Sequence, residues 1–394
     1  LLLLCILFIS RSILPAQTQT IDSLKNSLQN HPKADITRLN TLITLCTAYL
    51  DEMNGKKKMA EHLPEINTLS KKLNDKRGIA YGYLFGGLSN FRTGESTTII
   101  EQYFLALKQL EELGDKKGLA LCYLYLAKAN YHIGKYNEAM QYDQKSIKIK
   151  TEINDRIGIS NSYNGIASCY YIMGNYQQAL LYYFKALKIA EETNAKFGIS
   201  RSQLNIASVF ISQNKFDASL NYMEKALKTK KEIEDYEGEG LIYINMAALY
   251  TVKKEYQKAI DCCLKAIHLS EKMTVREVVL TAYVNLANIY VEQQKIDEAL
   301  VYFMKAYEGS MKTGAKITLV AVTTGIGNCY EQKKDAAAAI QFYKKSMNMA
   351  EEINYKIGVR DACSNLSKLY EKQGDYKQAL VYDKLLAAVK DTLL

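Results

Sequence analysis

The segment IGKYNEAM at residues 133–140 returns six more times along the chain, always 40 residues after the previous copy. The later copies are MGNYQQAL (173–180), QNKFDASL (213–220), KKEYQKAI (253–260), QQKIDEAL (293–300), KKDAAAAI (333–340) and QGDYKQAL (373–380). A fixed period of this length is typical of repeat architectures, in which each unit packs only against its neighbours. The period therefore predicts a stack of equivalent units.

Each unit contains two helical patterns with a turn between them. In one unit, apolar side chains recur at helical spacing from Tyr163 to Tyr170, and again from Tyr176 to Leu187. A Gly-Asn pair separates the two patterns, as expected for a turn. The stretch NAKFG at 194–198 predicts the end of the second helix, with Gly198 past that end.

Small and aromatic residues recur in columns at this period. Small residues allow two helices to approach closely, and tyrosines fill the space beside them. One small column lies on the first helices and comprises Ala127, Ala167, Ala207, Ala247, Ala287 and Gly327. Another lies on the second helices: Ala139, Ala179, Ala259, Ala299, Ala339 and Ala379. The aromatic column comprises Tyr170, Tyr250, Tyr290, Tyr330 and Tyr370. These columns predict apolar faces that only stacking can bury.

This combination of columns resembles the tetratricopeptide repeat, here lengthened from the usual 34 residues to 40. The resemblance implies an all-α fold, a TPR-type α-solenoid that forms a right-handed superhelix of antiparallel helix pairs. We expect eight tandem repeats over 78–394, the last one incomplete, a divergent first repeat over 36–77 and a leader helix over 17–35. The family Pro that ends the second helix is missing here.

The chain opens with the apolar run LLLLCILFI, followed by small and polar residues. This pattern predicts a signal peptide over residues 1–16, truncated at its start, because no basic residue precedes the run. The run is too short to cross a bilayer, which needs about 20 apolar residues. We therefore expect an exported protein at the periplasmic or extracellular face of the membrane. Lipid attachment at Cys5 and a buried first helix are the alternatives.

Asparagines form a column on the first helices, which in tetratricopeptide solenoids line the concave groove. The column contains Asn205, Asn245, Asn285 and Asn365, and a neighbouring position adds Asn288 and Asn328. Amide side chains both donate and accept hydrogen bonds, so a row of them suits the backbone of an extended peptide. In similar repeats these positions contact peptides. The alternative is that they tie adjacent repeats together. Gly165 and Gly325 interrupt the column.

Lysines form a second column, on the second helices. A basic stripe of this kind fits an acidic partner or an anionic surface, whereas the alternative is a solvated face balanced by nearby Glu. The column comprises Lys145, Lys185, Lys225, Lys265, Lys305 and Lys345. The seven cysteines beyond the signal lie among apolar residues without any CxxC spacing, so we expect buried free thiols.

Motifs for catalysis, metal binding and cofactor binding are missing from the sequence. The four histidines are dispersed, and there is no HExxH, P-loop, GxGxxG or GxSxG motif. The net charge of +9 is mild and interspersed in sign, which does not favour nucleic acid. We therefore expect no enzyme, no metal and no cofactor.

Two functions fit these observations. The first is a protein- or peptide-binding scaffold outside the cytoplasm. The second rests on the two ends of the chain, which resemble the exported repeat regions of bacterial sensor histidine kinases and membrane-bound transcription regulators. In that case, the chain would be the sensing region of a signalling protein whose membrane span and output domain lie beyond Leu394.

Overall fold

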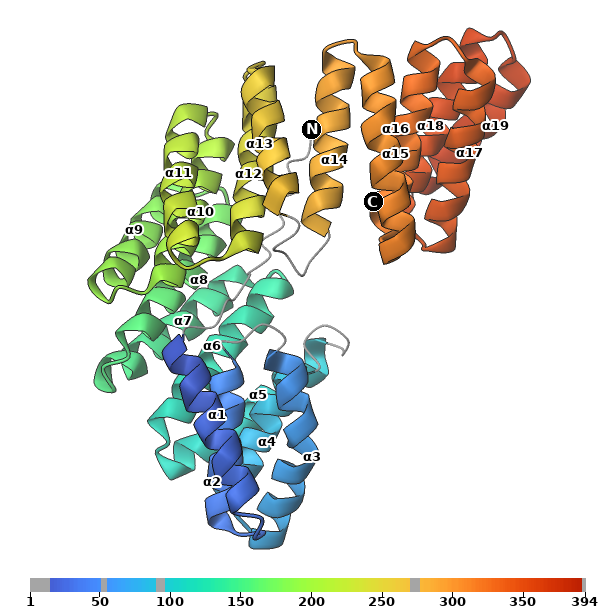
Figure 1. Ribbon diagram of the computed structural model, residues 1–394. Coiled ribbons are helices and arrows are strands. Elements are labelled where there is room, and N and C mark those ends of the chain that lie inside the picture. The colour runs from blue at the N-terminus through green and yellow to red at the C-terminus, as the bar shows by residue number, and fades with distance from the viewer. Residues whose placement is uncertain (1–14, 51–54, 90–95, 270–276, 392–394) are drawn as a thin grey trace. The chain divides into compact units, whose positions relative to one another are not determined.

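The computed structural model describes residues 15–50, 55–89, 96–269 and 277–391. Within these ranges every regular element is a helix, and the helices follow one another in antiparallel pairs (Figure 1). The predicted all-α repeat solenoid is therefore confirmed. Residues 1–14 of the expected export signal lie outside the described ranges. None of the described helices is both long and apolar enough to cross a bilayer.

The helices form two compact units, which meet in the sequence between Asp235 and Tyr236. The amino-terminal unit contains α1 (Pro15–Asn30), α2 (Ile36–Tyr49), α3 (Gly55–Leu73), α4 (Lys76–Ser89), α5 (Ser96–Leu113), α6 (Lys116–His132), α7 (Tyr136–Glu152), α8 (Arg156–Ile172), α9 (Tyr176–Glu192), α10 (Lys196–Ser212) and α11 (Phe216–Glu232). From α6 onward, first and second helices alternate as the 40-residue period predicts.

The carboxy-terminal unit repeats the same pairing. It contains α12 (Tyr236–Val252), α13 (Tyr256–His268), α14 (Glu277–Glu292), α15 (Ile296–Thr313), α16 (Lys316–Gln332), α17 (Ala336–Glu352), α18 (Lys356–Lys372) and α19 (Tyr376–Asp391). Each helix packs against the next one along the chain. A first helix also packs against the first helix of the following pair, as α12 does against α14.

The second helix α9 ends at a left-handed residue, and this residue is not the glycine that the sequence analysis selected. Asn194 has φ of 50°, and the amides of Asn194 and Ala195 bond the carbonyls of Glu191 and Ala190 at 3.0 and 2.8 Å. This is the Schellman pattern, and an Asn tolerates the left-handed region. Gly198 does lie past the end of α9, as predicted, but it falls in the first turn of α10 and does not cap α9.

The columns of small residues pack as predicted. Ala167 and Ala179 are fully buried, and the Tyr183 ring lies in the same cluster with 3% exposure. The tyrosines of the first helices stack on aromatic rings of the second helices, as in the pairs Tyr170–Tyr182, Tyr290–Tyr302, Tyr330–Phe342 and Tyr370–Tyr382. Such aromatic pairs contribute about 0.5–1.5 kcal/mol beyond the area that they bury. They therefore fasten these four helix pairs internally.

The glycines that interrupt the asparagine column have a packing reason. A Cβ placed on Gly325 would lie 2.5 Å from the ring of Phe303, and one on Gly165 would lie 2.3 Å from the carboxylate of Asp143. In both cases, a side chain from the preceding second helix fills the space. Glycine at these two positions therefore leaves room for a side chain of the neighbouring helix.

Candidate functional site

The six predicted asparagines all lie on first helices, but their surroundings differ. Asn205 on α10 is buried, with 7% exposure. Asn245 on α12, Asn285 on α14 and Asn365 on α18 are half-buried. The remaining two, Asn288 on α14 and Asn328 on α16, are exposed. The column is therefore not one uniform row of free amides.

Asn205 is tied to the neighbouring repeat. Its Nδ2 donates to Oδ1 of Asn164 at 3.2 Å, and Nδ2 of Asn164 donates to the Ser160 carbonyl and the Ser202 hydroxyl, both at 3.1 Å. All four residues are buried, so this network satisfies polar groups that would otherwise be costly to bury. Asn164 was not singled out from the sequence. Its only signal is an amide in a column whose other members are mostly apolar: Leu124, Leu204, Ile244, Val284, Thr324 and Ser364.

Asn328 and Asn365 are brought together in the carboxy-terminal unit. Nδ2 of Asn365 donates to Oδ1 of Asn328 at 3.4 Å, and the Tyr343 hydroxyl lies 2.7 Å from the same oxygen. That hydroxyl also lies 2.9 Å from Glu331, whose other oxygen pairs with Lys372 at 2.6 Å. Burial and the Glu331 carboxylate both raise the pKa of Tyr343, which keeps its hydroxyl a donor. These two asparagines thus belong to an internal polar network.

The three other asparagines keep their hydrogen-bonding capacity. Within the described residues, the side chains of Asn245, Asn285 and Asn288 form no hydrogen bond. Asn285 and Asn288 lie one turn apart on α14, and Asn245 lies on α12, which packs against α14. Each amide offers two donors and an acceptor oxygen. Because these amides are not bonded internally, α12 and α14 carry the part of the column that is suited to a ligand.

A buried charged cluster lies under Gly165 in the amino-terminal unit. Asp143 is 3% exposed, and its Oδ1 has no hydrogen-bond partner within the described residues. Burial raises the pKa of Asp143 to about 7, against the opposing influence of Lys150 and Ser162. The Nζ of Lys150 donates to the Ser162 hydroxyl and to the Gly158 carbonyl at 3.0 and 3.1 Å. The carboxyl group therefore lies in surroundings that favour its neutral form.

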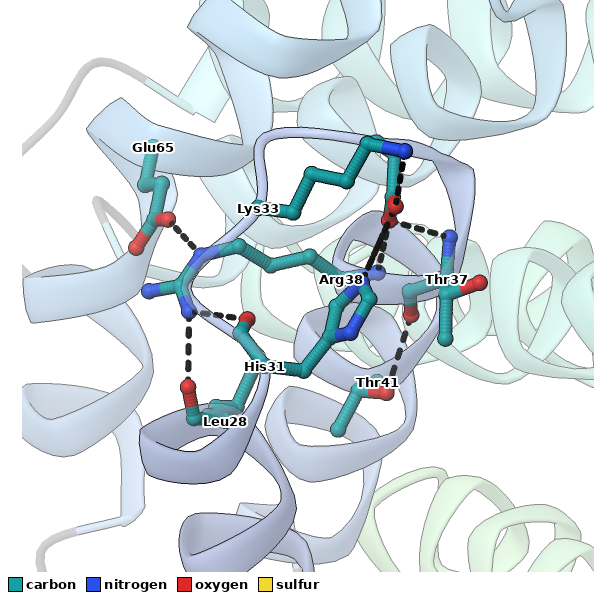
Figure 2. A network of polar contacts seen from close by, with 8 residues as sticks. Leu28, His31, Lys33, Thr37, Arg38, Thr41 and Glu65 are labelled. Carbon is teal, nitrogen blue, oxygen red and sulfur yellow. Dashed lines mark hydrogen bonds and ion pairs between the residues drawn. The ribbon is translucent and has the colours of Figure 1, made fainter.

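A second polar network joins the first three helices (Figure 2). Nε of Arg38 donates to Glu65 on α3 at 2.5 Å, and its Nη1 donates to the carbonyls of Leu28 and His31 at 2.8 and 3.0 Å. Asp35 accepts from the amides of α2 and contacts the His31 ring at 2.9 Å. A guanidinium thus bonds carbonyls at the carboxyl end of α1, where a positive charge is favourable.

The lysine column is packed against aromatic rings. Lys145, Lys185, Lys225, Lys265, Lys305 and Lys345 each hold Nζ within 6 Å of the centre of a tyrosine ring on their own or a neighbouring helix. At an exposed site, such a contact contributes about 0.5–1 kcal/mol. These contacts supply a structural reason for the column that the sequence analysis did not identify.

The described cysteines and carboxylates show no reactive arrangement. All seven cysteines are buried free thiols, as predicted. Burial raises their pKa, for example to about 12 at Cys122 and to about 11 at Cys363, so the reactive thiolate is disfavoured. Across the described ranges, no group of three or more His, Cys, Asp or Glu side chains is placed to hold a metal ion.

Several solved structures share this architecture. The apo form of RapI aligns with a TM-score of 0.61 and 17% identity, over 96% of this chain and 98% of RapI. The apo form of the quorum sensor NprR from B. thuringiensis aligns with a TM-score of 0.58 and 15% identity, over 95% and 99%. A Rap protein complexed with competence and sporulation factor aligns at 0.53 and 14%, over 90% and 97%. At such identities, the likeness shows the fold. No curated protein sequence matches the chain.

Family models supply the assignment that the structural likeness alone does not. A model described as tetratricopeptide repeat matches residues 158–232, 239–312 and 319–387. A second model with the same description matches residues 119–156. Together they cover more than half of the chain and most of the 40-residue repeats, so this chain belongs to the tetratricopeptide repeat family.

Proposed function

We propose that this chain is a non-catalytic scaffold that binds an extended peptide or protein segment along the first helices of its repeats. The observation that carries the proposal is the set of internally unbonded amides of Asn245, Asn285 and Asn288 on two packed helices. An extended backbone presents alternating donors and acceptors, which such amides match. The fold supports this assignment, because a Rap protein with the same architecture is complexed with competence and sporulation factor.

The test compares two pairs of Asn→Ala substitutions in the full chain. The first pair, Asn245→Ala with Asn285→Ala, removes the unbonded amides. The matched control, Asn221→Ala with Asn348→Ala, removes exposed asparagines from second helices. We expect a fluorescent pool of random decapeptides to bind the wild type and the control equally, and the first pair about tenfold more weakly, a loss of about 1.4 kcal/mol. Equal binding by all three proteins, with unchanged helical circular dichroism, would rule out the asparagine site.

The alternative is that the chain is the sensing region of a two-component sensor histidine kinase or a transcription regulator. The ending VYDKLLAAVKDTLL, which resembles the repeat ends of such proteins, motivates this alternative. NprR, a solved neighbour, is described as a quorum sensor. Sequencing the source gene beyond the codon for Leu394 tests the idea. A membrane span followed by a kinase or DNA-binding domain would support it, whereas a nearby stop codon would contradict it.

The location outside the cytoplasm belongs to the same proposal. It rests on the apolar run at residues 1–9 and the small and polar residues that follow it. Cell fractionation with amino-terminal sequencing of the mature protein provides the test. A mature protein in the periplasmic or surface fraction that begins near residue 17 would support export. An unprocessed cytoplasmic protein would contradict it.

A further inference from the structure

The outer faces of α7, α9 and α11 carry two columns of lysine, and the fold explains only the first. Each first-column lysine holds its Nζ over a tyrosine ring, and the column comprises Lys145, Lys185 and Lys225. The second column lies three residues further along each helix and comprises Lys148, Lys188 and Lys228. These three side chains are exposed, and within the described residues they form neither an ion pair nor a contact with a ring.

The doubled lysines are confined to one part of the chain. The positions of the second column on α13, α15 and α17 carry His268, Glu308 and Asn348 instead. Lys108 on α5 is a further member, but Leu105 replaces the first-column lysine there. Like charges one turn apart destabilise a helix slightly. Three such pairs on three consecutive second helices therefore indicate a role outside the fold.

The three helices lie next to one another in the amino-terminal unit. The first helix α8 packs against both α7 and α9, and α10 packs against both α9 and α11. The ring of Phe184 on α9 lies 6.2 Å from the ring of Tyr222 on α11, measured between centroids. Figure 1 shows α7, α9 and α11 along one side of this unit. The six lysines therefore form a continuous surface, which we call the lysine band.

The carboxylates of these helices do not neutralise the lysine band. Glu138 and Asp217 lie in the first turns of α7 and α11, whereas Glu191 and Glu224 lie beside the lysines. Over residues 115–235, the chain contains 17 Lys and Arg against 12 Asp and Glu. This part of the chain is therefore positively charged and favours an anionic partner. The carboxylates at the ends of the three helices already have partners, in the ion pairs Glu152–Lys116, Glu192–Arg156 and Glu232–Lys196.

Two apolar side chains adjoin the lysine band on its central helix. Leu181 and Phe184 are 46% and 40% exposed, and they lie one turn before Lys185 and Lys188. The Phe184 ring packs edge-on against Tyr222, so it is not free to enter a bilayer. The backbone of a nucleic acid presents no apolar group to Leu181. A partner that satisfies both features carries carboxylates and an apolar side chain on one segment.

We propose that the lysine band, together with Leu181 and Phe184, is a second binding surface that docks an acidic protein segment with an apolar side chain among its carboxylates. The carboxylates contact the second-column lysines, and the apolar side chain covers Leu181. Because tyrosine rings already position the first-column lysines, these side chains lose little freedom on binding. The surface lies on second helices, so it is separate from the asparagine site on the first helices and does not depend on it.

The test measures fluorescence anisotropy on the full chain with a labelled octapeptide of six glutamates around two leucines. We expect saturable binding of this peptide, about tenfold weaker binding when both leucines are replaced by serine, and none when the glutamates are replaced by glutamine. Equal binding of the glutamate and glutamine peptides would overturn the proposal. Stronger binding of an oligothymidylate of equal charge, or of phosphatidylserine vesicles, would overturn the choice of a protein partner.

Two triple variants separate the lysine band from general charge effects. We expect the first variant to raise the Kd for the leucine peptide about tenfold and to keep its helical circular dichroism, because the lysines that it removes have no contact in the fold; it combines Lys148→Gln, Lys188→Gln and Lys228→Gln. The control removes the same charge from exposed positions of the carboxy-terminal unit and should leave Kd within about twofold; it combines Lys312→Gln, Lys377→Gln and Lys384→Gln. An equal rise in both variants would contradict a localised site.

The apolar contact is tested by pairing a variant with the two acidic peptides. Leu181→Ser should weaken the leucine peptide about tenfold while leaving the serine peptide unchanged, because only the leucine peptide covers that side chain. Leu385→Ser, which changes an exposed leucine of α19, is the matched control and should alter neither affinity. If Leu181→Ser bound the leucine peptide as tightly as the wild type, or lost affinity for both peptides equally, the proposed docking would be wrong.

Discussion

The buried carboxyl group of Asp143 gives the fold a pH dependence that a single substitution should remove. Its folded-state pKa is raised from 3.8 to about 7, chiefly by burial. A raised pKa means that the folded state prefers the protonated form, so the related stability is fully present below pH 3.8. That stability is lost as the pH rises through the folded pKa. Asp143→Asn keeps the size of the side chain but removes the ionisation.

The size of the effect follows from the pKa shift. At about 1.4 kcal/mol per unit, the shift of Asp143 corresponds to about 4 kcal/mol between pH 3.8 and pH 7. Relaxation around the charged pair reduces this value. We therefore expect the free energy of unfolding of Asp143→Asn, relative to that of the wild type, to increase by about 2–4 kcal/mol across that window. Burial lowers the pKa of the neighbouring Lys150 to about 8. The pH dependence that Lys150 adds to stability therefore lies between about pH 8 and pH 10.5, above the window of Asp143.

The assay is urea unfolding followed by circular dichroism at pH values from 4.5 to 7.5. The control is Asp383→Asn, which changes an exposed carboxylate at the same repeat position of α19. We expect the midpoint difference between Asp143→Asn and wild type to grow steadily with pH, whereas the control shows no such growth. A difference that stays constant over this range would refute the reasoning, because it would show that Asp143 does not change its ionisation on folding.

Three further substitutions test the packing and the polar networks. Gly325→Ala should lower the free energy of unfolding by about 1–3 kcal/mol, because the new methyl group meets the Phe303 ring; thermal melts measure this, and Phe303→Leu should restore part of the loss. Asn164→Ala should cost about 1–3 kcal/mol because it leaves the buried Asn205 amide without its acceptor, and an equally stable variant in urea titration would show that the bond contributes nothing. Arg38→Met should speed amide hydrogen exchange in the last turn of α1 while leaving α6 onward unchanged, and uniform exchange across the chain would contradict this local role.

The 40-residue period made the helix pairs predictable, because it constrains every unit at once. Ala167, Ala179 and Tyr170 occupy the positions that their columns predicted, and they pack as expected. The helix ends were harder to predict from the sequence. The left-handed residue after a second helix is Asn194 in one repeat and Glu234 in the next, so its conformation is set by the loop and not by one residue type. A glycine nearby was therefore a misleading signal.

The candidate site was only partly predictable, because a column shows position but not partners. Asn205 and Asn245 occupy equivalent positions, yet only Asn205 faces an amide on the preceding first helix. That difference depends on Asn164, 41 residues earlier, where the other repeats place mostly apolar side chains. One polar exception in a neighbouring column thus converts a potential ligand contact into a structural bond. The reverse also holds for Asn245 and Asn285. The positions 41 residues before them carry Leu204 and Ile244, and neither asparagine has an internal partner within the described residues, so the sequence pattern itself indicates which amides remain available for binding.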